Sequence, residues 1–230
     1  MDDLTLYGTP NIDVILRRSA QARRMTLRVS RLDGRVTLTL PKKAALRDAA
    51  DFAQQREPWI RKHLDQHVSS QPVTLGQVIP ILGADRTITS GEGRAISLSD
   101  DQIAVPGPPA QVGRKLQAWL KTTARSELAY ASDQYAALLG KPYAKLTLRD
   151  TRSRWGSCTS AGGLMYSWRL IMAPVEVLTY VAAHEVAHLA EMNHSPAFWN
   201  TLEGLYGDYR PPKTWLRKHG HALHRYRFDD

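Results

Sequence analysis

Apolar and polar residues alternate from residue 25 to residue 40, on both sides of an Asp33-Gly34 pair. Alternation with a period of two is typical of a half-buried strand, and Asp-Gly is a strong signal for a tight turn between strands. This segment therefore predicts a β-hairpin. Residues 44–67 instead space their apolar side chains at helical intervals around Pro58, which predicts one broken helix or two short ones.

Short β-branched runs separated by Gly, Asp and Pro fill residues 73–105 and predict several small antiparallel strands. A Pro-Gly-Pro-Pro segment at 106–109 ends this region. We therefore expect a β-rich N-terminal region over 1–108, with a helix near 44–67, and a second domain over 109–230.

The second part mixes helix and strand patterns, so the expected fold class is α+β. Its longest element is an amphipathic stretch from Gln111 to about Leu139, closed by Gly140. The elements expected after it are a strand at 143–150, a hairpin-like pair around Gly162-Gly163, a helix from Pro174 to about Glu191, a helix opened by Ser195-Pro196 and a short helix near 213–222.

Composition narrows the class of protein. With 43% apolar and 23% charged residues among 230, the sequence is that of an ordinary globular protein. No basic segment followed by an apolar run opens the chain, and no eighteen apolar residues occur in succession, so we expect no secretory signal, no membrane span and a cytoplasmic location. The single cysteine, Cys158, excludes an internal disulfide and leaves histidine and carboxylate as metal ligands.

The formal net charge of +9 favours contact with an anionic partner, such as nucleic acid, a nucleotide or an acidic protein surface. A solvated basic surface without a dedicated partner is the alternative.

Three histidines and two glutamates stand in HEVAHLAEMNH at 184–194, directly after a mostly apolar helical segment. His184 and His188 are four residues apart, so a helix places both imidazoles on one face. Glu185 follows the first of them. This is the HExxH pattern, in which two histidines bind zinc and the glutamate is the general base.

A third histidine, His194, follows beyond the expected helix end. Asn193 can adopt the left-handed conformation that ends a helix, and Ser195 with Pro196 can start another. The chain would then turn sharply and bring His194 back toward the first two histidines. Three ligands with one open coordination position are typical of a catalytic zinc site.

Two alternatives stay open for this motif. Its polar residues could simply be hydrogen-bonded within a buried helix. His194 could also be only the flank of the next helix, and Glu203 would then be the best replacement ligand. A second cluster has spacings unsuited to one helical face, and we interpret it as surface or supporting residues: His219, His221 and His224.

The histidine spacing is also that of the metzincin proteases, but Glu191 stands where that pattern has a glycine, and no methionine follows residue 192. The segment SRWGSC at 153–158, together with 166–199, instead resembles the YgjP-like metallopeptidase family, relatives of the SprT and WLM metallopeptidases in the zincin group. The sequence departs from that family at Ser167, where we would expect Asn.

The resemblance implies a zincin-like metallopeptidase domain with an HExxH active-site helix and a small antiparallel sheet. It also implies that His184, His188 and His194 bind one Zn²⁺ per chain, with Glu185 as the general base. Two further residues of the motif, Arg154 and Trp155, would form or support the strand beside the cleft, unless they serve only packing and turn formation.

Other side chains have candidate roles around this centre. The candidate donors to a developing oxyanion are Arg154, Tyr166 and Tyr209. We expect Cys158 to be a small buried thiol rather than a nucleophile. We expect Phe198 and Trp199 to be core anchors that fix the turn at His194.

The expected function is a zinc metallopeptidase acting on a peptide or protein substrate. One alternative is a metal-dependent nucleotide hydrolase that attacks phosphoanhydrides, and another is a nucleic-acid-associated module whose zinc site acts on bound proteins. The basic surface would bind the nucleotide or nucleic acid. No P-loop, RNP-like aromatic motif or dinucleotide glycine pattern occurs, so these alternatives have no motif of their own.

Overall fold

The structure is a computed structural model that describes residues 3–30, 34–65 and 70–228. The chain forms two compact units, Met1–Ser70 and Gln71–Asp230, which are described separately.

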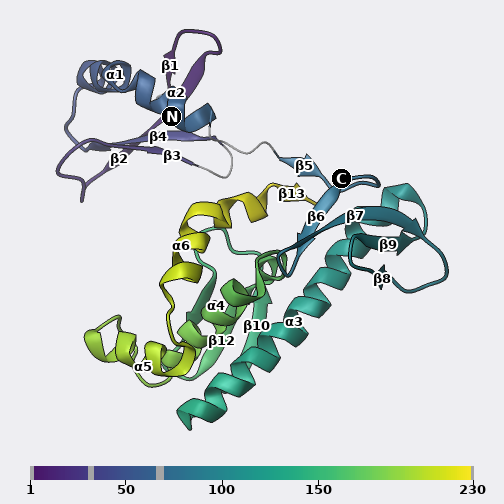
Figure 1. The fold of residues 1–230 in the computed structure, drawn as a ribbon. Helices are drawn as coiled ribbons and strands as arrows, with labels where there is room; N and C mark the ends of the chain where they lie inside the picture. The colour runs from purple at the N-terminus through teal and green to yellow at the C-terminus, as the bar shows by residue number, and fades with distance from the viewer. Residues whose placement is uncertain (1–2, 31–33, 66–69, 229–230) are drawn as a thin grey trace. The chain divides into compact units, whose positions relative to one another are not determined.

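The first unit is a four-stranded sheet with two helices (Figure 1). The strand order is β1-β2-β4-β3, in which β2 and β4 are parallel and the other neighbours antiparallel. Its elements are β1 Asp3–Leu6, β2 Ile12–Ser19, β3 Thr26–Val29, β4 Val36–Pro41, α1 Leu46–Gln55 and α2 Glu57–Asp65. The core of this unit includes the fully buried side chains Val14, Leu38 and Ile60.

The predicted hairpin is confirmed by the antiparallel pairing of β3 with β4, although Asp33 of its predicted turn lies outside the described residues. The helical pattern at 44–67 forms two helices rather than one, with a break at Arg56. Pro58 is the second residue of α2, a position where its missing N–H leaves no helical hydrogen bond unmade.

The second unit begins with a four-stranded sheet in the order β6-β7-β9-β8. Its strands are β6 Val78–Ile81, β7 Ala84–Gly91, β8 Ser97–Leu98 and β9 Gln102–Pro106. The prediction of small strands holds, but β7 and β9 pair in parallel, so the sheet is mixed. A parallel pair of strands, β5 Gln71–Pro72 and β13 Tyr226–Arg227, joins the beginning of this unit to its end.

We had placed these strands in the N-terminal region by dividing the chain at 108–109. The structure instead groups them with the residues that follow. Ile79, Ile88 and Ile103 are buried in the same core as Leu116 of the long helix that follows. The Pro-Gly-Pro-Pro segment connects these strands to the helix within one unit, and it leads into the 3-10 helix η1 Pro109–Gln111. The compact unit therefore starts near residue 71.

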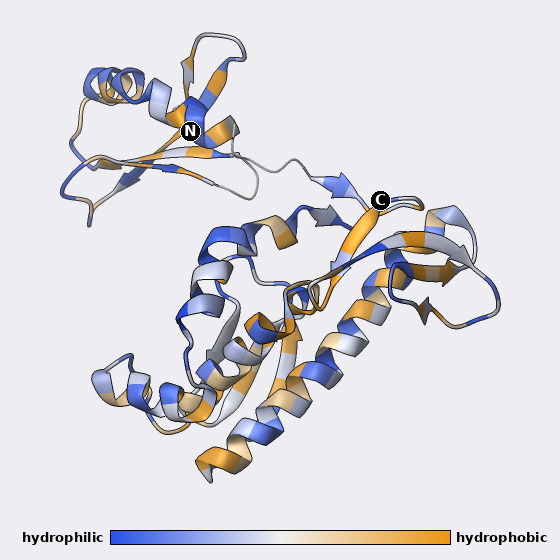
Figure 2. Ribbon diagram, viewed as in Figure 1, coloured by the Kyte–Doolittle hydropathy of each residue, from blue (hydrophilic) through white to orange (hydrophobic). Residues whose placement is uncertain are grey.

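Helix α3 Val112–Leu139 is the longest element and runs beside β10 (Figure 1). Leu116, Leu120, Ala124 and Leu128 recur every four residues and are fully buried, so one face of the helix packs inward. Hydrophobic and hydrophilic residues accordingly alternate along it in Figure 2. The helix ends, as predicted, at Gly140, which has a φ of 70°.

A three-stranded sheet follows in the order β10-β12-β11. Its strands are β10 Lys145–Arg149, β11 Gly156–Cys158 and β12 Gly163–Ser167. The prediction of an antiparallel sheet is correct only in part. Strands β11 and β12 form the expected antiparallel hairpin, but β10 and β12 run parallel. The chain leaves β10, crosses to the edge strand β11 and turns back between them, so β12 takes the direction of β10.

The remaining elements are η2 Trp168–Met172, α4 Val175–Ala187, α5 Pro196–Tyr206, α6 Arg210–His219 and η3 Gly220–His224. Helix α4 ends with His188 as its C-cap, about one turn before the predicted end. Helix α5 starts as predicted, because the Phe198 backbone N–H donates to Ser195 Oγ over 3.4 Å and Pro196 takes the first helical position. Within the described chain, no helix is long and apolar enough to cross a membrane.

Candidate metal centre and active site

Helix α4 carries two of the three histidines in its last turn and at its end. The helix is buried on most sides, by Val177, Leu178 and Val181 among others. His184 and His188 project from the same face, and their ring centroids lie 5.1 Å apart. The four-residue spacing therefore places both imidazoles on one face of the helix, as predicted from the sequence.

The third histidine lies beside the other two. The donor nitrogens of His184, His188 and His194 all lie within 4.8 Å of one another, and His184 Nε2 is 3.0 Å from His194 Nε2. The turn that returns His194 begins at Asn193, whose side-chain oxygen accepts a hydrogen bond from the Ser195 backbone N–H over 3.1 Å. Asn193 does not take the left-handed conformation that we predicted, because α4 already ends at His188 and Leu82 is the one described non-glycine residue with a positive φ. Its side chain instead caps the turn, and Ser195 starts α5 as predicted.

Phe198 supports all three imidazoles from α5. Its ring centroid lies 4.9 Å from that of His184, 4.5 Å from that of His188 and 4.8 Å from that of His194. The side chain is fully buried, which agrees with its predicted role as a core anchor. Trp199 stacks on His194 at 5.6 Å and restrains that ring from the other side.

The electrostatic surroundings favour neutral imidazoles. Burial, reinforced by the other two histidines and by Lys213, lowers the pKa of His184 to about 3. Burial, His188 and Lys213 also lower the pKa of His194. A neutral imidazole keeps the lone pair that a metal ion requires, so the lowered pKa values of His184 and His194 favour the form suited to ligation.

Lys213 is a neighbour of the triad that the sequence did not indicate. Its ammonium lies 4.0 Å from the centroid of the Trp199 ring and 5.6 Å from that of Tyr209, a cation–π arrangement that holds the lysine beside the histidines. The one feature of the sequence that could have indicated it is that Tyr209 and Lys213 are four residues apart at the start of α6. That spacing alone does not predict a place beside the histidines.

The histidine set fits a divalent zinc ion. Zinc takes histidine nitrogens as ligands, and donor nitrogens that lie within 4.8 Å of one another, two of them 3.0 Å apart, are close enough to share one ion. His188 Nδ1 donates to the Glu191 carbonyl oxygen over 2.9 Å, which leaves Nε2 with a free lone pair. In the described part of the chain His184 Nδ1 is buried without a hydrogen-bond partner.

Glu185 follows His184 on α4 and is only 5% exposed. Burial raises the pKa of its carboxyl to about 8, against the opposing charge of Arg154. Strand β11 covers this carboxyl closely: a Cβ atom placed on Gly156 would lie 2.5 Å from Glu185 Oε1 and 2.6 Å from its Cγ. Only a glycine at 156 lets the strand approach the carboxyl in this way.

We predict that Gly156→Ala lowers turnover at least tenfold while the metal content stays unchanged. The added methyl group would displace the Glu185 carboxyl. In the role of general base that the sequence predicts for Glu185, misplacement by about 1 Å can reduce rates by roughly 10²-fold. Steady-state kinetics beside elemental analysis would measure both quantities. Gly204→Ala on α5 is the matched control, since a Cβ there meets nothing within 4 Å. Unchanged kinetics in Gly156→Ala would refute the positioning role.

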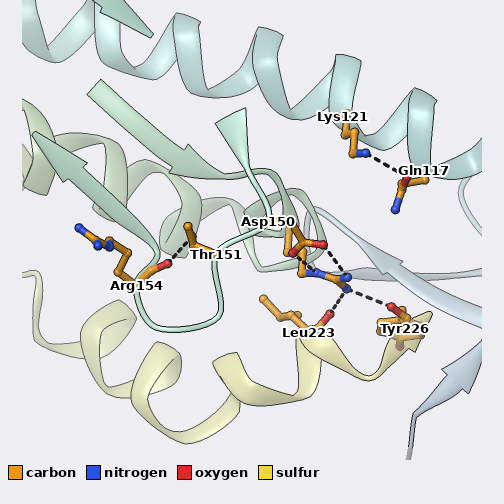
Figure 3. Close-up of polar contacts among 8 residues, drawn as sticks. Gln117, Lys121, Asp150, Thr151, Arg154, Leu223 and Tyr226 are labelled. Atoms are coloured by element: carbon orange, nitrogen blue, oxygen red, sulfur yellow. Dashed lines mark hydrogen bonds and ion pairs between the residues drawn. The ribbon is translucent and has the colours of Figure 1, made fainter. Parts of the chain in front are cut away.

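An ion pair between the buried Arg169 and the exposed Asp150 holds the loop that leads into β11. Arg169 is 8% exposed and bonds both oxygens of Asp150, over 2.7 and 3.0 Å. Its Nη1 also donates to the carbonyl oxygens of Leu223 and Tyr226 (Figure 3). The start of the loop is thereby fixed to the C-terminal segment.

The other end of this loop is fixed by aromatic packing. The Trp155 ring lies 5.1 Å from that of His224, and its Cζ2 would be 3.0 Å from a Cβ on Gly220. In the loop itself, Thr151 Oγ1 donates to the Arg154 carbonyl oxygen over 2.8 Å (Figure 3). Trp155 therefore packs against the C-terminal segment at Gly220 and His224, and this contact sets the position of the adjoining Gly156.

The remaining candidates take different places. Arg154 is exposed, and its charge acts on Glu185. Tyr209 stacks on Trp199 at 5.1 Å, one ring removed from His194. Tyr166 is fully buried and hydrogen-bonded to Ser132 Oγ over 3.0 Å, so it belongs to the core and is unsuited as an oxyanion donor.

The alternative ligands and nucleophile lie outside this arrangement. Glu203 is exposed on α5 and is not part of the cluster, and neither are His219, His221 and His224. Burial and the charge of Glu185 raise the pKa of Cys158 to about 11, which agrees with an inert thiol.

Comparison with known proteins adds one family and one structure. The model of the YgjP-like metallopeptidase domain matches residues 23–219. The crystal structure of the metallopeptidase zymogen of Pyrococcus abyssi abylysin aligns with a TM-score of 0.34 and 20% identity, over 42% of this chain and 92% of that chain. No curated protein gives a significant match. The residues matched by the family include the histidine triad, Glu185 and strand β11.

Proposed function

The chain belongs to the YgjP-like metallopeptidase family, and from this premise we propose that it is a zinc-dependent peptidase. In this proposal His184, His188 and His194 hold one zinc ion, and Glu185 is the general base. The observation that carries it is the convergence of three histidine nitrogens within 4.8 Å beside a buried glutamate. An all-imidazole set that leaves one coordination position open suits zinc in a catalytic role.

When bound, zinc lowers the pKa of a water molecule to about 7 and polarises a carbonyl group. Glu185 accepts the proton from the attacking water and then returns it to the leaving amine nitrogen. Burial raises the pKa of this carboxyl, which favours its uptake of that proton. Arg154 and Tyr209 remain the candidate donors to the developing oxyanion.

Within the described residues β11 pairs only with β12, so its other edge offers a place for the substrate backbone. The Trp155 carbonyl oxygen and the Thr159 N–H bond to β12, over 2.8 and 3.0 Å. Because these groups alternate along an antiparallel strand, the backbone groups of Gly156 and Cys158 point away from β12. A peptide in extended conformation can pair with them and pass beside Glu185.

The test is a metal-dependent cleavage assay on the full chain. We expect about one zinc per chain by elemental mass spectrometry and cleavage of internally quenched peptides, with activity lost on chelation and restored by zinc. A panel of nucleoside triphosphates assayed in parallel would separate peptidase from nucleotide hydrolase. Triphosphate hydrolysis without peptide cleavage, or failure to bind zinc, would overturn the proposal.

A further inference from the structure

The sheet β10-β12-β11 has a second face, directed away from α4, and this face carries a depression of about 330 Å³. Side chains alternate across a strand, so Leu146, Leu164 and Gly156 face the core or Glu185 while their neighbours face outward. The outward row across the three strands is Thr147, Met165 and Ser157, which the strand register aligns and which all line the depression.

The depression is strongly basic. Lys145 and Arg149 stand two residues on either side of Thr147, and Arg154 closes the end beside β11. Among the described residues none of these three cations forms an ion pair, and no acidic side chain lines the depression. The side chains between the charges include the hydroxyl groups of Thr147, Thr151, Ser157 and Thr159. A binding partner for this surface would therefore be anionic.

The depression adjoins the strand edge where the substrate would bind. Ser157 points into it, while the backbone groups of Gly156 and Cys158 face the free edge of β11. A peptide paired with that edge continues the sheet, so its side chains alternate between the α4 side and the basic side. Every second side chain of the peptide would then lie on the face of the sheet that carries the depression, where Arg154 is the cation nearest to β11 and Lys145 and Arg149 lie farther across the sheet.

We propose that this basic depression binds acidic side chains of the peptide substrate, placed at every second residue of a strand paired with β11. The inference rests on the proposed peptidase function and adds a substrate class to it. A carboxylate peptide is favoured over single-stranded nucleic acid because no aromatic side chain, on which bases could stack, lines the depression in the described part of the chain.

The experiment uses two series of quenched peptides that differ only in which alternate positions, counted from the cleaved bond, carry glutamate. These two placements are called frames, and the same positions carry glutamine in the reference peptides. Glutamate in one frame should raise kcat/KM roughly fivefold at low salt, and glutamate in the other frame should not. The double variant Lys145→Glu and Arg149→Glu should at least halve this preference, because it reverses the charge of two of the three cations that line the depression. Arg94→Glu with Arg114→Glu is the matched control, because both residues are exposed and neither lines the depression.

Direct binding keeps the two proposals separable. If the zinc-loaded chain cuts no peptide, the proposed function fails, and anisotropy of labelled peptides then tests the depression alone, with tighter binding again expected for one glutamate frame. Equal binding or cleavage in all frames would overturn the inference, as would an equal loss in the control variant. Displacement of the acidic peptide by a single-stranded oligonucleotide that binds more tightly would also overturn it and assign the depression to nucleic acid.

Discussion

Glu185→Gln is expected to lower kcat roughly 10³-fold, within the range that a positioned general base contributes, while the zinc content stays at about one per chain. The amide has nearly the shape of the carboxyl but cannot take a proton from water. Glu185 is also separate from the cluster of nitrogen donors, so its replacement leaves the histidines in place. Single-turnover kinetics with zinc-loaded protein, beside elemental analysis, would measure both quantities.

Glu203→Gln is the matched control for this prediction, because Glu203 is an exposed glutamate outside the cluster. It should retain both activity and zinc. A Glu185→Gln variant with more than about a tenth of the wild-type kcat would remove this residue from the role of general base. Loss of zinc in the same variant would show instead that the carboxyl supports the metal site.

The parts of the site that lie close in sequence could be predicted from it. His184, Glu185 and His188 share one helix, so their arrangement follows from helical periodicity. The return of His194 was predicted from a sharp turn before the Ser195-Pro196 start of α5, and that start is confirmed. The left-handed helix end predicted at Asn193 was wrong, because α4 ends one turn earlier and Asn193 acts through its side chain.

The contacts that depend on packing between distant segments could not be predicted. Gly156 meets Glu185 across 29 positions of sequence, and nothing local to either residue indicates the other. Lys213 reaches the triad only because α6 packs on α4. The parallel pairing of β10 with β12 is likewise set by how the edge hairpin folds back.

The division of the chain was missed for a related reason. A Pro-Gly-rich segment can be a linker or a tight turn, and its composition is the same in both cases. What decides is whether the flanking strands share a core with the following helix, as Ile88 and Ile103 do with Leu116. Alternating β-branched patterns give the inward face of such strands but do not identify what packs against it.

His184→Ala and His188→Ala are expected to weaken zinc binding by more than about 100-fold, because the loss of even an outer partner of a ligand costs about 10–100-fold. His194→Ala should weaken it less. All three rings contact Phe198, but His184 and His188 are held by a buried helix, whereas His194 is exposed on the connecting turn. A less restrained ligand loses more conformational entropy on binding, so it contributes less net affinity.

Competition against a zinc chelator, with circular dichroism to verify folding, would rank the three variants. His219→Ala is the control, since this exposed histidine lies outside the cluster and should leave zinc affinity unchanged. An unchanged affinity in His194→Ala would reduce the site to two histidines and require a ligand from elsewhere. A loss equal to that of His184→Ala would mean that the turn at Asn193 and Ser195 is as rigid as the helix itself, and that all three ligands are preorganised before the metal binds.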